Sequence, residues 1–130
     1  MLPLESVVCG VYLDFVRRVT SEPRFLANIR HPEAGWKVSR SELRMFLGEK
    51  ATMQCFIRAC QLMGLAVHWV SKKSVLIRRD PIEAFRQLLA PGGDGEYCIS
   101  LDDARLFEAS TGLRIVDLAG RLGLRVRITN

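Results

Sequence analysis

Apolar residues recur with a helical period at the start of the chain. They form one stripe, made up of Leu4, Val8, Val11, Phe15 and Val19. This spacing predicts a helix over about residues 3–20. Ser21 then begins a predicted short helix, and residues 31–36, HPEAGW, are predicted to form a loop.

Two helices with a turn between them are predicted next. Ser39 and Glu42 have the spacing of a capping box, and Gly48 ends the helix that they begin. The expected buried residues of this helix are Leu43, Phe46 and Leu47. The second helix starts near Lys50 and ends at Gly64. Its expected core face consists of Met53, Phe56, Ile57 and Cys60.

A β-hairpin and a further helix follow. Residues 65–79 hold two runs rich in β-branched and aromatic side chains, and Lys72 and Lys73 lie in the turn between them. The segment DPIEAFRQLLA has an N-terminal Asp, a Pro at the first helical position and a Glu that completes a capping box. Residues 80–90 are therefore predicted to be helical, and the turn-rich residues 91–97, PGGDGEY, are predicted to be a linker.

The nonapeptide VSRSELRMF, which begins at Val38, is repeated in outline by ISLDDARLF, which begins at Ile99. Both open with an apolar residue and Ser, carry an acid at the fifth position, and end in Arg, an aliphatic residue and Phe. A second match, GLAVHW at Gly64 and GLRVRI at Gly123, has nearly the same offset. Two matches at nearly one offset predict that one structural unit is used twice.

The second unit is predicted to consist of two helices and one strand. Ser100 and Asp103 repeat the capping box. The residues expected in its core are Ala104, Leu106, Phe107, Ile115, Leu118, Ala119 and Leu122. The closing strand has Leu124, Val126 and Ile128 on one face and two Arg on the other. Because a lone strand cannot satisfy its backbone groups, it is expected to pair with a strand of the first unit or of a second chain.

The order of elements over residues 1–90, a helix followed by helix, turn, helix, strand and basic hairpin, resembles the winged-helix superfamily of helix-turn-helix proteins. The resemblance rests on this order, on the capping boxes and on the Gly-Leu exit into a strand. It implies an α+β, mainly α fold, in which a winged-helix-like domain with an N-terminal helix and a linker helix precedes a degenerate, wingless unit over residues 96–130. It also implies binding of DNA or RNA, with the second helix of the unit in a major groove and the hairpin on the backbone or in the minor groove.

The net charge of +5 comes from one part of the chain. Residues 37–79 contain nine Lys and Arg against Glu42 and Glu49, whereas basic and acidic residues nearly cancel elsewhere. Attraction to phosphates grows with local charge, so this concentration favours a polyanion-binding surface. A solvated basic face that only keeps the protein in solution is the alternative interpretation.

The candidate DNA-contacting residues are polar or basic side chains of this middle third, namely Arg40, Arg44, Lys50, Thr52, Gln54, Arg58, Gln61, Lys72, Lys73 and Arg78. Gln54, Arg58 and Gln61 form one polar stripe on the second helix and can reach base edges, with Arg58 suited to a guanine. Lys72 and Lys73 are expected to contact phosphates. These residues predict a non-catalytic protein that binds double-stranded DNA, such as a transcriptional regulator or a chromatin or replication accessory protein.

The same helix is apolar on a second face, at Ala51, Cys55 and Leu62, and a helix that is apolar on two faces is usually packed on both. The second unit or a protein partner would then cover this face. An alternative therefore stays open, in which the protein is a structural subunit or an interaction adaptor of a larger complex. Both interpretations leave room for a homodimer through the N-terminal helix or the C-terminal strand.

Catalytic and metal chemistry find little support in the sequence. The densest acidic cluster, Asp102, Asp103 and Glu108, is explained in part by the helix dipole and has no His or Lys beside it. The cysteines are Cys9, Cys55, Cys60 and Cys98. Their spacing does not suit a metal site, even with His68 added, and they are interpreted as small core residues. A disulfide between Cys9 and Cys98 stays open. We therefore expect no enzyme activity, no cofactor and no metal.

The composition is that of a globular protein. At 130 residues, with 48% hydrophobic and 25% charged, the chain is long enough for one good core or two small ones. Its apolar stretches are too short for a membrane span, and its N-terminus lacks the features of a signal peptide, so a cytoplasmic protein without a membrane partner is expected. The excess of Arg over Lys and the scarcity of Asn and Gln are typical of a high-temperature or GC-rich source.

Overall fold

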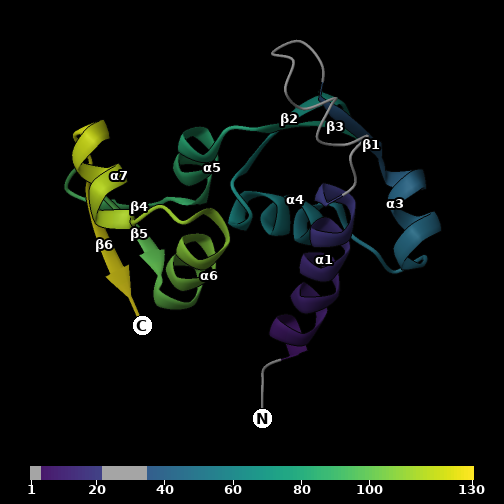
Figure 1. Ribbon diagram of the computed structural model, residues 1–130, viewed down its shortest axis with the longest axis horizontal. Helices are drawn as coiled ribbons and strands as arrows, with labels where there is room; N and C mark the ends of the chain where they lie inside the picture. Colours follow the sequence, from purple (N-terminus) through teal and green to yellow (C-terminus); the bar gives the residue numbers. More distant parts are fainter. Residues whose placement is uncertain (1–3, 22–34) are drawn as a thin grey trace.

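The computed structural model describes residues 4–21 and 35–130 (Figure 1). Its first part contains α1 (Leu4–Thr20), β1 (Trp36–Ser39), α3 (Arg40–Leu47), α4 (Met53–Leu62), β2 (Leu65–Ser71) and β3 (Ser74–Arg79). Its second part contains α5 (Pro81–Leu88), β4 (Ala90–Gly93), β5 (Glu96–Ser100), α6 (Leu101–Thr111), α7 (Ile115–Leu122) and β6 (Arg125–Thr129). The predicted α+β class, rich in helix, is confirmed. The short helix predicted after Ser21 lies outside the described residues, as does most of the loop predicted before β1.

The first hydrophobic core lies between a three-stranded antiparallel sheet and the helices α1 and α4. The strands have the order β1-β3-β2, so that Val38 lies opposite Val75 and Val67 opposite Ile77, all four buried. They share this core with the fully buried Phe56 of α4. The predicted hairpin of β2 and β3 is confirmed. Strand β1 was not predicted, because its four residues are held by pairing with the distant β3.

Helix α1 lies where the sequence predicted it, but its buried face coincides only in part with the predicted apolar stripe. Tyr12, Phe15 and Val16 are buried, whereas Val11, which was expected in the buried stripe, is 53% exposed. Tyr12 points inward, and its hydroxyl accepts a hydrogen bond of 2.8 Å from the backbone N–H of Thr52 just before α4. The predicted stripe is therefore right for Phe15 and wrong for Val11.

A capping signal begins α3 as predicted. The hydroxyl of Ser39 accepts a hydrogen bond of 3.1 Å from the backbone N–H of Glu42, and Gly48 is the C-cap. Leu43 is fully buried, as expected. Phe46 was expected to be buried and is instead exposed, because the two-turn helix turns only one narrow face toward the core.

Helix α4 begins at Met53 and not near Lys50, because Thr52 is its N-cap. The expected core residues Met53, Phe56 and Cys60 are buried. The second apolar face predicted for this helix is covered by the first core itself, where α1 packs on α4. The residues of this face that belong to the core are Ala51, Cys55 and Leu62.

The second hydrophobic core is built from α5, α6, α7 and a small sheet. Phe85 of α5 and Phe107 of α6 are fully buried in it, with their ring centroids 6.0 Å apart. Ser100 accepts a hydrogen bond of 3.1 Å from the N–H of Asp103, so the second capping box is confirmed. The expected core residues that are buried are Ala104, Phe107, Ile115, Leu118 and Ala119. Leu106 packs instead against the first core, which joins the two parts.

Two predictions about the second part are wrong. Residues 91–97 are not a linker, because they belong to a hairpin of β4 and β5 with Asp94 at φ 52° in its turn. The final strand β6 pairs in parallel with β5 of its own unit, and not with a strand of the first part. Pairing with a second chain stays a prediction. The hairpin was not predicted because β4, with the sequence APGG, has little strand propensity of its own. Strand β5 was therefore not considered as a partner for β6.

The two parts share an order of elements. Each runs from a strand through a Ser N-cap into two helices, a Gly and a strand, so that β1, α3, α4 and β2 correspond to β5, α6, α7 and β6. Their sheets differ, because β3 lies between β1 and β2, whereas β5 and β6 are direct neighbours. The repeat suggested by the two nonapeptides therefore extends to the helices and their flanking strands.

Gly64 lies where the two parts approach each other. Its φ is +80°, and a Cβ on this residue would lie 2.7 Å from Cγ2 of Thr111 at the end of α6. Thr111 is not free to rotate, because its hydroxyl donates to the Phe107 carbonyl at 2.7 Å. We predict that Gly64→Ala lowers the free energy of unfolding by about 2–4 kcal/mol, from the positive φ and from overpacking.

The matched control is Gly123→Ala, at the corresponding position of the second part. Gly123 also has a positive φ, of +65°, but nothing lies within 4 Å of its added Cβ. This variant should lose only the backbone contribution, about 1–2 kcal/mol. Urea denaturation measures both variants, and equal losses would contradict the close contact at Gly64.

Candidate functional site

The hairpin tip and the start of α3 form one basic surface. The backbone N–H of Arg40 donates to the carbonyl of Lys73 at 2.8 Å, which holds the tip beside the helix. Arg44 lies one turn further along α3, and Lys72 completes the tip; all four residues are exposed. These four residues, called the basic surface below, make no ion pair in the part of the chain that the structure describes. Their charges are therefore available to an external anion.

Three further residues predicted to contact DNA differ in how available they are. Lys50 is exposed in the turn before α4. Thr52 uses its hydroxyl as the N-cap of α4, where it accepts a hydrogen bond of 3.4 Å from the N–H of Cys55. Arg78 is half-buried on β3, and its Nε is buried without a hydrogen-bond partner among residues 4–21 and 35–130. Of these three, Lys50 is the one that presents an exposed cation.

The polar stripe predicted on α4 faces the second part of the chain. Nη2 of Arg58 donates to both carboxylate oxygens of Asp103 on α6, at 2.9 and 2.7 Å. Nε2 of Gln61 donates to Oε1 of Gln87 on α5, at 3.2 Å. Gln54 is exposed and makes no side-chain hydrogen bond to the described residues. The stripe thus offers one amide to a ligand and uses two side chains to join the two parts.

Gln87 also closes the outer edge of β2. Its amide accepts a hydrogen bond of 3.0 Å from the N–H of Val67 and donates one of 3.1 Å to the Val67 carbonyl. A neighbouring strand would satisfy the same two backbone groups. Because the same side chain also accepts from Gln61, it fixes α5 against both α4 and β2.

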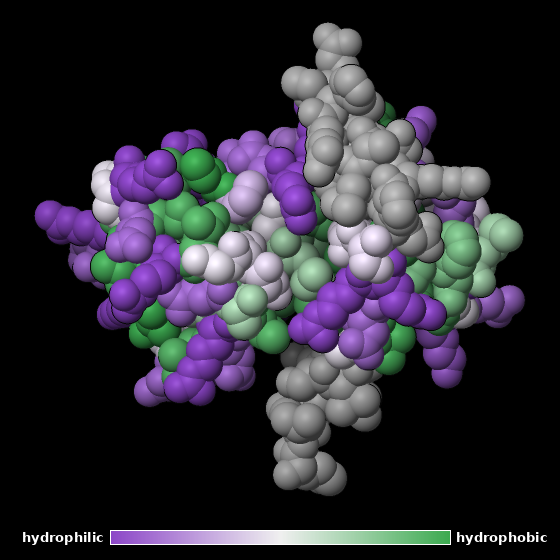
Figure 2. Space-filling model, viewed as in Figure 1, coloured by the Kyte–Doolittle hydropathy of each residue, from purple (hydrophilic) through white to green (hydrophobic). Residues whose placement is uncertain are grey.

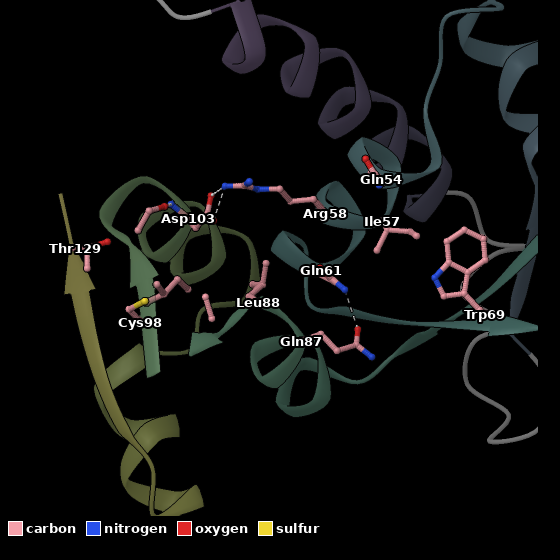
Figure 3. A pocket seen from close by; sticks show the side chains of 13 residues that line it. Gln54, Ile57, Arg58, Gln61, Trp69, Gln87, Leu88, Cys98, Asp103 and Thr129 are labelled. Carbon is pink, nitrogen blue, oxygen red and sulfur yellow. Dashed lines mark hydrogen bonds and ion pairs between the residues drawn. The ribbon is translucent and has the colours of Figure 1, made fainter. Parts of the chain in front are cut away.

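A groove with a volume of about 620 Å³ lies between α4 and the second part (Figure 3). Gln54, Arg58 and Gln61 line one of its walls, and residues of α5, β5 and α6 line the other. Trp69 of β2 lies at one end. The ion pair between Arg58 and Asp103 bridges the two walls (Figure 3), so the groove depends on the packing of the two parts.

Sequence reasoning found one wall of this groove and missed the other. Asp103 was interpreted only as a helix-capping acid, and its pairing with Arg58 is a contact between distant segments that no local pattern predicts. Gln87 was not singled out, because its role depends on the edge of β2 lying beside α5. Trp69 was counted as a strand residue. Its place near the hairpin tip, beyond the end of the core, was the one signal that could have marked it as exposed.

One further acid and one thiol of the described residues have a clear place in the fold. Glu108 accepts a hydrogen bond of 2.9 Å from the backbone N–H of Ile115 at the start of α7. Burial raises the pKa of the Cys60 thiol far above its ordinary value, so this thiol stays protonated at neutral pH. Cys98 is a free thiol. Within the described ranges, no group of three or more His, Cys, Asp or Glu is placed to hold a metal ion.

A second exposed feature lies on α3, beside the basic surface. Met45 is 82% exposed and Phe46 is 67% exposed, and we call these two residues the apolar patch. The ring of Phe46 touches α1 on one side, with its centroid 5.6 Å from that of Phe15. Figure 2 shows hydrophobic atoms at this end of the molecule. Large apolar side chains exposed together are typical of a contact surface.

Comparisons of the chain with protein-family models, with curated proteins and with solved structures found no match. The resemblance to the winged-helix superfamily therefore stays a prediction. Among the described helices, none combines the length and the hydrophobicity needed to cross a membrane. The function has to be argued from the chemistry of the surfaces described above.

The contact between Arg58 and Asp103 can be measured with a double-mutant cycle. The carboxylate is largely buried and accepts two charged hydrogen bonds, so Arg58→Ala should lower the free energy of unfolding by about 0.5–1.5 kcal/mol. Asp103→Ala should cost a similar amount, and the double variant should cost less than the sum of the two. Urea denaturation of the three variants gives the coupling energy.

The exposed pair of Arg17 and Asp14 on α1, with an N–O distance of 3.6 Å, is the control. Both of its partners are exposed, so its coupling energy should be close to zero. A coupling energy for Arg58 and Asp103 no larger than that of the control would contradict their role in joining the two parts.

Proposed function

We propose that this protein is a non-catalytic DNA-binding protein that contacts the phosphate backbone through its basic surface. The observation that carries the proposal is the backbone hydrogen bond from Arg40 to Lys73, which holds the hairpin tip beside α3. It gathers four exposed cations that make no ion pair with the residues that the structure describes. Neutralising phosphates with such cations releases counterions, which supplies most of the affinity of sequence-independent binding.

The resemblance to the winged-helix superfamily supports the same surface. It implies that the hairpin contacts the backbone or the minor groove, and the hairpin of this chain carries Lys72 and Lys73 at its tip. The resemblance also implies a second helix that reads bases in a major groove. We do not include that step for α4, because Arg58 and Gln61 of its polar stripe are bound to the second part.

A role as an interaction subunit is the second candidate function, and the apolar patch favours it. Met45 and Phe46 are large, exposed and adjacent to the basic surface. A protein partner that covers them would bury apolar area, which DNA would not do to the same extent. The two candidates differ in one measurable respect, because backbone binding depends steeply on salt concentration and apolar burial does not.

The test is the salt dependence of duplex binding by the double variant Lys72→Ala with Lys73→Ala. Removing two phosphate contacts should flatten the slope of log K against log salt by about 1.8, whatever the DNA sequence. Fluorescence anisotropy of a labelled duplex at about 50 to 200 mM salt measures this slope.

The control is Arg105→Ala with Arg121→Ala, which removes the same charge from exposed positions on α6 and α7. These residues lie outside the basic surface, so the slope should stay close to that of the unaltered protein. An unchanged slope in the lysine variant would remove the hairpin from the binding surface. Equal changes in both variants would mean that only the total charge matters.

A further inference from the structure

The groove beside α4 contains an exposed tryptophan that the packing of the fold does not explain. Trp69 is 55% exposed and makes no ring contact with another described residue. Trp36, by contrast, packs edge-on against Phe56 with a centroid distance of 5.6 Å. A large aromatic ring left in water forgoes the free energy of burial, and such residues in grooves are typical anchors of binding sites.

We propose that this groove binds an unpaired nucleobase of a single-stranded nucleic acid, which stacks on the ring of Trp69. The inference rests on the proposed function, since it takes phosphate binding at the basic surface as its starting point. It goes beyond that function by naming the substrate, a strand with unpaired bases. Bases inside a duplex are stacked on each other, so a base must leave the stack before it can reach a protein ring.

The residues around Trp69 supply the other contacts that such a base needs. Gln54 lines the same groove, and its amide is exposed and unbonded among the described residues, so it can both donate to and accept from a base edge. Lys72 and Lys73 follow Trp69 by three and four residues on the same hairpin, where they can hold the neighbouring phosphates. Stacking and phosphate contacts together are how proteins bind single strands.

The charge of the region favours a nucleic acid over a peptide as the occupant. The cation of Arg58 inside the groove is matched by Asp103, whereas the lysines beside Trp69 are unmatched by any described acid. Unmatched positive charges on the same hairpin as Trp69 attract a polyanion. An apolar peptide would gain from Trp69 and Ile57 but would leave these lysines without a counter-charge.

The experiment compares an intact single-stranded oligonucleotide with one of the same length and charge in which the central positions are abasic. Anisotropy titrations use the full chain and its variant Trp69→Ala. The unaltered protein should bind the intact strand about 5- to 100-fold more tightly than the abasic strand, because base stacking is lost on the latter. Trp69→Ala should bind both strands equally, at the level of the abasic strand.

Two further variants keep the test specific. Trp69→Phe retains an aromatic face and should recover part of the preference for the intact strand, which a merely structural role of Trp69 would not produce. Gln54→Ala should reduce the differences in affinity among single strands of different base composition, while its salt slope stays unchanged. Thermal unfolding checks that each variant is folded, as expected for exposed positions.

The outcomes separate this inference from the proposed function. If the unaltered protein binds intact and abasic strands equally, or if Trp69→Ala weakens binding to both by the same factor, the groove is not a base site. The proposed function survives either result as long as the lysine variant still flattens the salt slope. If the full chain binds neither duplex nor single strand, the proposed function and this inference fail together.

Discussion

Helix α4 is packed on opposite sides, and both parts of the chain depend on this double packing. Its apolar residues complete the first core together with α1 and the sheet. Its polar stripe meets the second part, where Arg58 binds Asp103 and Gln61 binds Gln87. A helix held in this way cannot enter a DNA groove without losing contacts on one side. The surfaces that remain for a ligand are therefore the groove beside α4, the tip of the hairpin of β2 and β3, and α3.

The hairpin of β2 and β3 carries side chains for two kinds of interaction. The charges at its tip act over several ångströms and depend on salt, whereas the ring of Trp69 acts only on contact. Because Trp69 and the lysines are only a few residues apart on one hairpin, we expect a bound nucleic-acid strand to contact both. The backbone hydrogen bond from Arg40 to Lys73 connects the hairpin to α3. The position of the tip therefore depends on the packing of the first core as well as on the turn. We infer that the hairpin is the element on which the proposed function depends.

The sequence predicted what local chemistry determines and missed what distant pairing determines. The helix starts at Ser39 and Ser100 follow from capping boxes, in which the hydrogen-bonding groups lie three residues apart. Strands β1 and β4 were missed because they are short, and β4 consists of residues that disfavour strands, so each exists through its partner. In the candidate site, too, local features could be predicted and contacts between distant segments could not. Its basic residues could be named from local charge, but the pairing of Arg58 with Asp103 and the exposure of Trp69 depend on how the two parts meet.

Mapping of chemical shifts by nuclear magnetic resonance shows which residues a bound nucleic acid contacts. A short single-stranded oligonucleotide is added to the full chain, and the backbone amides and the Trp69 indole N–H are followed. We predict changes at the hairpin tip, at the start of α3 and at the Trp69 indole, with little change on α7. Changes confined to α7 and β6, or no change at the hairpin when the strand binds, would contradict this prediction.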